Sequence, residues 1–85
     1  MPANFQRELA ERVRQLARLQ AVLNANGGRP PAEWAEQTAF PFLAAFAVED
    51  VAEFAGELAA DLRDASARES LESYEGNLEA WRTGG

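Results

Sequence analysis

The chain contains no cysteine, histidine, lysine or isoleucine, and all eight of its basic side chains are arginines. The absence of cysteine excludes a disulfide framework, a thiolate metal site and a thiol nucleophile. Without histidine and lysine, the chain also lacks the usual general base and the amine that forms Schiff bases. Ser66, Ser70 and Ser73 therefore have no such residue to activate them. We expect that the protein is not an enzyme and that it uses neither a cofactor nor a metal ion.

The 85 residues carry 14 acidic and 8 basic side chains, which gives a net charge of −6. This balance disfavours a nucleic-acid partner, because the phosphates of DNA and RNA repel an acidic surface. The longest apolar stretch, residues 39–48, is too short to cross a membrane, and residues 1–7 lack the apolar run of a signal peptide. We expect one cytoplasmic domain over residues 1–85, without a membrane partner, that ends in a short flexible tail at Gly84 and Gly85.

Apolar side chains recur at helical spacing along most of the chain, and no long stretch alternates with the period of two that is typical of strands. Gly27 can end the first helix, and Pro31 and Pro41 can each occupy the first position of a short helix. The sequence therefore predicts an all-α fold, a small bundle of four to five helices at about 4–24, 31–39, 41–47, 49–65 and 67–82.

The boundary between the last two predicted helices rests on the direction of their apolar stripes. If residues 49–82 formed one straight helix, its two stripes would face different cores. Ser66 and Glu69 have the spacing of a capping box, so we place a break near Ala65. The alternative is one long helix whose two faces meet different subunits.

The first predicted helix carries a stripe of leucines, three of which are spaced by a heptad. Arg12 falls within this apolar face. It can extend its charged end to water, form a buried ion pair, or make a polar contact that sets the register of a dimer. A domain of this length has a small core, and self-association would add buried area. We therefore predict a homodimer that forms through Leu9, Arg12, Leu16, Leu19 and Leu23.

The helix predicted at 49–65 carries its acidic residues opposite its apolar stripe. This arrangement is typical of a solvated helix face, and it also suits the docking of a basic partner. The carboxylates cannot converge on one metal ion, because a helix separates successive residues by about 1.5 Å along its axis. Two tryptophans near a chain break or end are further candidates for an interface. The predicted partner-binding residues are Glu49, Asp50, Glu53, Glu57, Asp61, Asp64, Trp34 and Trp81.

Segment 50–58 (DVAEFAGEL), followed at a distance by segment 78–82 (LEAWR), resembles the C-terminal region of small actinobacterial proteins grouped with toxin–antitoxin loci. The resemblance covers less than half of the chain and includes no catalytic motif. Those antitoxins usually begin with a strand-rich DNA-binding segment, whereas this chain begins with a leucine-striped helix. No site residue carries over from the resemblance.

The leading hypothesis is a small acidic helical module that binds or neutralises a protein with a basic surface, in the manner of an antitoxin or a regulatory adaptor. One alternative is a structural subunit of a helical homo-oligomer or a multi-protein assembly. Another is a nucleic-acid-binding regulator that uses the first helix, since residues 1–29 carry a net charge of +3 and residues 30–85 a net charge of −9.

Overall fold

The computed structural model describes residues 2–84, and the side chains of residues 4–84. It contains three α-helices, α1 (Pro2–Ala25), α2 (Val48–Arg68) and α3 (Glu72–Arg82). Three 3₁₀ helices connect α1 to α2, namely η1 (Pro31–Glu33), η2 (Ala35–Gln37) and η3 (Pro41–Ala45). No strand occurs between residues 2 and 84, so the all-α class is confirmed. Of the expected glycine tail, Gly85 lies outside the described residues.

The prediction of four to five helices is wrong, because the segments 31–39 and 41–47 form 3₁₀ helices of three to five residues. Each segment starts at a proline and ends at a residue with extended backbone, Thr38 and Phe46 respectively. The backbone N–H of Phe40 then donates to the Thr38 hydroxyl at 3.0 Å, which fixes the turn before Pro41. Pro41 has no backbone N–H and disfavours the α region at Phe40, whose φ is −126° and ψ 66°, so a helix from the first segment cannot continue into the second.

The break between α2 and α3 lies later than predicted. α2 continues through Ala65 to Arg68, and Glu69 adopts the left-handed conformation with φ 56° and ψ 41°. The N–H of Ser70 donates to the carbonyl of Ala65 at 3.2 Å, which closes the helix end. Ser66 lies inside α2, so its predicted capping box does not form. The alternative of one continuous helix is also wrong, because α3 folds back beside α2.

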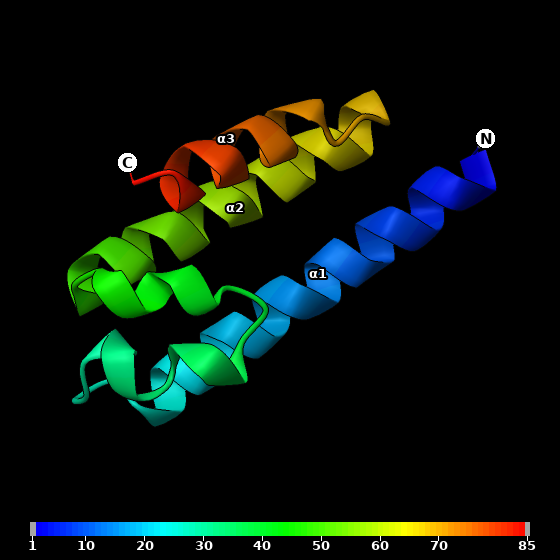
Figure 1. Ribbon diagram of the computed structural model, residues 1–85. Coiled ribbons are helices and arrows are strands. Elements are labelled where there is room, and N and C mark those ends of the chain that lie inside the picture. Colours follow the sequence, from blue (N-terminus) through cyan, green and yellow to red (C-terminus); the bar gives the residue numbers. More distant parts are fainter. Residues whose placement is uncertain (1, 85) are drawn as a thin grey trace.

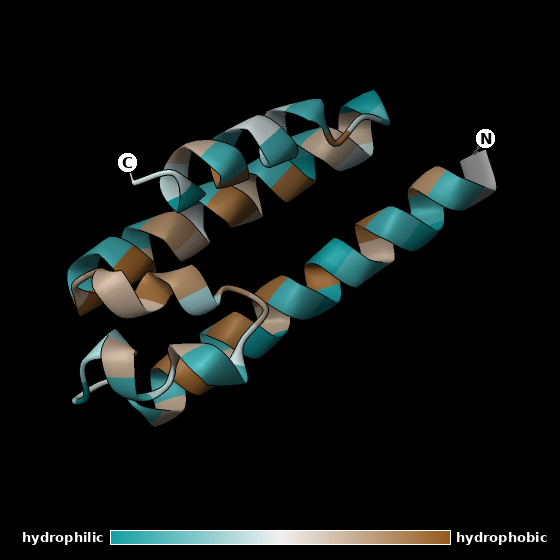
Figure 2. Cartoon of the chain, viewed as in Figure 1, coloured by the Kyte–Doolittle hydropathy of each residue, from teal (hydrophilic) through white to brown (hydrophobic). Residues whose placement is uncertain are grey.

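The helix α2 lies between α1 and α3 and packs against both of them, as Figure 1 shows. The 3₁₀ helices pack on one another near the end of α1 and the start of α2 (Figure 1). Along α1 and α2, hydrophobic positions recur among hydrophilic ones (Figure 2), as expected for helices that bury one face. This arrangement turns the acidic face of α2 partly towards solvent and partly towards α3.

The core is built from side chains of every α-helix together with the 3₁₀ region. Fully buried members include Leu19 of α1, Leu43 of η3, and Val51, Phe54 and Leu58 of α2. Burying one leucine or phenylalanine stabilises a fold by about 1.5–3 kcal/mol. No charged side chain is buried among residues 4–84. The core is therefore apolar, and polar interactions lie around it.

The leucine stripe of α1 packs inside this same chain. Leu16 and Leu19 are buried, and Leu9 and Leu23 are half-buried against the core. The guanidinium of Arg12 lies 3.9 Å from the carboxylate of Glu75 on α3. The residues predicted for self-association therefore make contacts within one chain, which removes most of the apolar area on which that interface depends. The homodimer stays a prediction.

Candidate protein-interaction site

The acidic face of α2 divides into two parts with different surroundings. The first part comprises Glu49, Asp50 and Glu53, which we call the α2 acidic surface. All three side chains are exposed, and no arginine of the described residues lies within ion-pairing distance of them. Their mutual repulsion is consequently balanced only by water, dissolved ions and the positive end of the helix dipole.

The second part of the face is used within the chain. Asn77 of α3 donates from Nδ2 to Glu57 Oε1 at 3.1 Å and to Asp61 Oδ2 at 2.9 Å. The indole Nε1 of Trp81 donates to the same Glu57 oxygen at 2.9 Å. Asp64 pairs with Arg68 one turn further along α2, with 3.2 Å between Oδ1 and Nε. The predicted partner-binding residues Glu57, Asp61 and Asp64 thus already have partners in this fold.

These hydrogen bonds change the acidity of Glu57. The hydrogen bond from Trp81, followed by that from Asn77, lowers the pKa of the Glu57 carboxyl from its usual value. Both bonds favour the ionised form, because a carboxylate accepts hydrogen bonds better than a carboxylic acid. The ionised Glu57 carboxylate therefore accepts two hydrogen bonds that stabilise the packing of α3 against α2 at neutral pH.

Asn77 is the residue of this network that the sequence analysis did not identify. It lies four residues before Trp81, so both side chains point from the same side of α3. That spacing is a signal in the sequence. It does not say which helix the shared side faces, and only the packing of α3 against α2 shows that Glu57 and Asp61 lie opposite.

Trp81 lies at the edge of the aromatic part of the core. Its ring centroid is 5.5 Å from that of Phe46 and 5.4 Å from that of Phe54, and the side chain remains half-exposed. A shallow depression of about 310 Å³ lies beside it, which we call the Trp81 depression. Its lining residues are Phe46, Asp50, Asn77, Ala80 and Trp81.

Trp34 is placed differently from Trp81. Its side chain is 1% exposed, and its indole Nε1 donates to the backbone carbonyl of Arg29 at 3.2 Å. The 3₁₀ helices η1 and η2 meet at this residue and place its ring in the core. Trp34, predicted as a partner-binding residue, is therefore a member of the core, and Trp81 is the tryptophan that reaches the surface.

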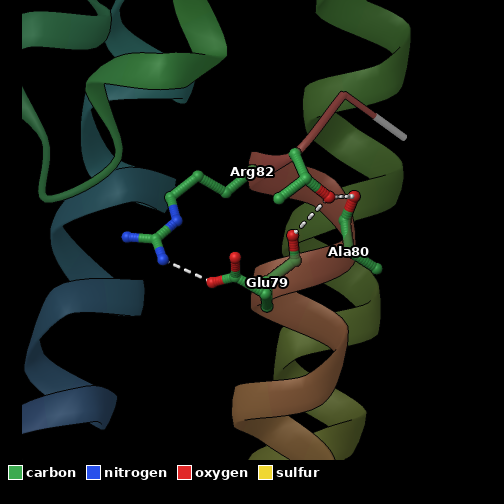
Figure 3. Close-up of polar contacts among 4 residues, drawn as sticks. Glu79, Ala80 and Arg82 are labelled. Carbon is green, nitrogen blue, oxygen red and sulfur yellow. Dashed lines mark hydrogen bonds and ion pairs between the residues drawn. The ribbon is translucent and has the colours of Figure 1, made fainter.

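The end of α3 is closed next to the Trp81 depression. The hydroxyl of Thr83 contacts the carbonyl oxygens of Glu79 and Ala80 at 3.0 and 3.3 Å. Figure 3 shows these contacts together with Arg82, which reaches back to the Glu79 carboxylate. The backbone N–H of Thr83 also donates to the Glu79 carbonyl at 3.0 Å, so the hydroxyl mainly supplies a donor to the Ala80 carbonyl, which a helix end otherwise leaves without one. Ala80 is consequently held in a regular helical position at the depression.

A larger groove of about 560 Å³ lies between α1 and α3. Four charged residues line it, and they form two ion pairs, Arg12 with Glu75 and Arg82 with Glu79. The charges of the groove are therefore already compensated inside the chain. The α2 acidic surface, in contrast, has no compensating arginine among the described residues.

Nearby, the hydroxyl of Tyr74 is buried and has no hydrogen-bond partner within the described part of the chain. Burial is the main reason that the pKa of this phenol is raised, since desolvation disfavours the charged phenolate. The phenol therefore stays neutral at physiological pH and serves as a member of the core.

Comparison with known proteins adds no relative to this description. No protein-family model matches the chain, and searches of curated proteins and of solved structures found no match. Within residues 4–84, no three carboxylates gather as a possible metal site. None of the described helices combines the length and the apolarity needed to span a membrane.

Proposed function

We propose that this protein is a small helical interaction module that binds a protein with a basic surface through the α2 acidic surface. One observation carries the proposal: three exposed carboxylates, Glu49, Asp50 and Glu53, lie within five residues and have no arginine partner among the described residues. A cationic partner would relieve their repulsion and would be attracted over long range. Neutralisation of such a partner, as the antitoxin resemblance implies, belongs to the same proposal.

The alternative of nucleic-acid binding through α1 receives less support. Two of the arginines on the outer side of α1 make contacts within the chain. Arg14 pairs with Glu11, and Arg18 donates from Nε to the carbonyl of Gln37 at 3.1 Å. These contacts reduce the number of cations that are free to meet phosphates. Binding to a DNA duplex at low salt that is lost in Arg14→Gln, Arg18→Gln would support this alternative.

The proposal is tested by neutralising the α2 acidic surface. The triple variant Glu49→Gln, Asp50→Asn, Glu53→Gln removes three negative charges. It changes the contact of Glu53 with the Glu57 carboxyl, and it leaves the donors Trp81 and Asn77 of Glu57 in place. We expect captured basic proteins in pull-downs from the cells of origin to fall by about tenfold, because three exposed ion pairs contribute roughly 0.5 kcal/mol each.

A matched control separates this site from net charge. The exposed residues Glu36, Glu69 and Glu72 also have no ion-pair partner among residues 4–84. Their replacement by glutamine changes the net charge equally and should leave capture unchanged. Equal capture by both triple variants and the unmodified protein would reject the proposed function.

A further inference from the structure

The Trp81 depression combines two kinds of wall. Phe46, Ala80 and the indole of Trp81 give it an apolar side, and the carboxylate-bearing Asp50 gives it an acidic rim. Its volume of about 310 Å³ is at the small end of the range for ligand sites, about 300–1,000 Å³. It therefore has the size of a subsite for one long side chain.

The apolar side is held in a fixed orientation. The indole of Trp81 is held at one end by the 2.9 Å hydrogen bond to Glu57 and is flanked by the rings of Phe46 and Phe54. Asn77, which also lines the depression, has its amide nitrogen engaged by Glu57 and Asp61. A ligand would therefore meet a preformed aromatic wall, and the side chains of the depression would lose little conformational entropy on binding.

Asp50 decides the chemistry of the occupant. An apolar side chain in the depression would cover this carboxylate without compensating it, which costs free energy. A cationic side chain compensates the charge and is also attracted to the face of an indole ring. Between the two cationic residues, the planar guanidinium of arginine can stack on an aromatic ring and donate two parallel hydrogen bonds to one carboxylate.

We propose that the Trp81 depression binds one arginine side chain of the basic partner, stacked against Trp81 and paired with Asp50. This inference rests on the proposed function and specifies which residue of the partner anchors it. Glu49 and Glu53 then contribute attraction around the anchor, whereas Asp50 contacts it directly.

The two tryptophans of the chain provide the measurement. In a ¹H–¹⁵N NMR spectrum, the indole N–H signals report separately on Trp81 beside the depression and on the buried Trp34. The probes are the peptides acetyl-Ala-Arg-Ala-amide and its lysine and citrulline analogues, each titrated to millimolar concentration. Citrulline has nearly the shape of arginine but no charge.

We expect the arginine peptide to shift the Trp81 signal in a saturable way and to leave that of Trp34 in place. The lysine peptide should bind at least about threefold more weakly than the arginine peptide, and the citrulline peptide should cause no saturable shift. Asp50→Asn should weaken the arginine peptide by about fivefold, while the exposed and distant Glu36→Gln should not.

Three results would overturn the inference: no shift with the arginine peptide, equal shifts with citrulline, or an unchanged titration in Asp50→Asn. Its failure can be separated from failure of the proposed function. If partner capture depends on the three carboxylates and the peptides leave Trp81 unaffected, the arginine anchor is wrong and the acidic docking surface stands. If capture does not depend on those carboxylates, the proposed function itself fails.

Discussion

Replacement of Glu57 by alanine tests whether the contact between α2 and α3 depends on a charged hydrogen-bond acceptor. The Glu57 carboxylate accepts bonds from Trp81 at 2.9 Å and from Asn77 at 3.1 Å, and both donors belong to α3. In Glu57→Ala, Trp81 Nε1 loses the acceptor it has within the chain, while Asn77 keeps its bond to Asp61. We expect α3 to be held less firmly and the whole fold to be less stable.

The magnitude follows from these two bonds. A hydrogen bond to a charged group contributes about 1.5–3 kcal/mol when buried. Because Glu57 is half-exposed, water replaces part of each bond, and we take about 1 kcal/mol for each. Alanine has a slightly higher helix propensity than glutamate, which offsets a few tenths of a kcal/mol. The free energy of unfolding should therefore fall by roughly 1–2 kcal/mol, which corresponds to a decrease of about 4–16 °C in Tm.

The pH dependence provides a second, independent reading of the same contact. The folded-state pKa of Glu57 lies below its ordinary value of 4.5, which we take for the unfolded chain. Between the folded and the unfolded pKa, the unfolded chain therefore binds more protons than the folded protein. The contribution of Glu57 to stability is complete above the unfolded pKa and is lost as the pH falls through the folded pKa. The stability difference between the unmodified protein and Glu57→Ala should shrink below about pH 4.5.

Urea unfolding followed by circular dichroism at pH 7 and at pH 3.5 to 5 measures both effects. Glu36→Ala is the control, since Glu36 is exposed and has no ion pair among residues 4–84. It should change stability by less than about 0.5 kcal/mol. If Glu57→Ala also changes stability by less than this at pH 7, or if its effect is independent of pH, the reasoning is refuted.

Three further substitutions test the packing of the core. Tyr74→Phe should raise the free energy of unfolding by about 1 kcal/mol, because it removes a buried hydroxyl without a partner among the described residues. If urea unfolding shows a lower stability instead, the hydroxyl makes a hydrogen bond in the folded protein. Leu19→Ala should lower the free energy of unfolding by about 2–5 kcal/mol. If Leu19 packs within one chain, this decrease should not depend on protein concentration. Arg12→Ala should lower the free energy of unfolding by less than about 1 kcal/mol, and by still less in high salt, because the 3.9 Å ion pair between Arg12 and Glu75 is partly exposed. A decrease above about 2 kcal/mol would contradict this and would indicate that the Arg12 side chain is buried.

Sequence patterns located the long helices well. The apolar periodicity of residues 4–24 and 49–65 lies within α1 and α2. Gly27 follows the end of α1, but it does not adopt the left-handed conformation for which glycine was the expected residue. The end of α2 was missed because Glu69 adopts a left-handed conformation that glycine or asparagine usually occupies. Nothing in the residue type signals this turn, after which α3 packs against α2.

The sequence by itself determined the helical class, the apolar stripes and the row of acids on α2, because each of these follows from the 3.6-residue period of a single helix. Only the tertiary structure decided what each face meets. It buried the leucine stripe of α1 and the ring of Trp34 inside one chain, and it placed Asn77 and Trp81 against Glu57. Periodicity assigns a direction around one helix axis, whereas the partner in that direction depends on how the helices pack. That packing leaves Glu49, Asp50 and Glu53 as the exposed, unpaired part of the acidic row in the described chain.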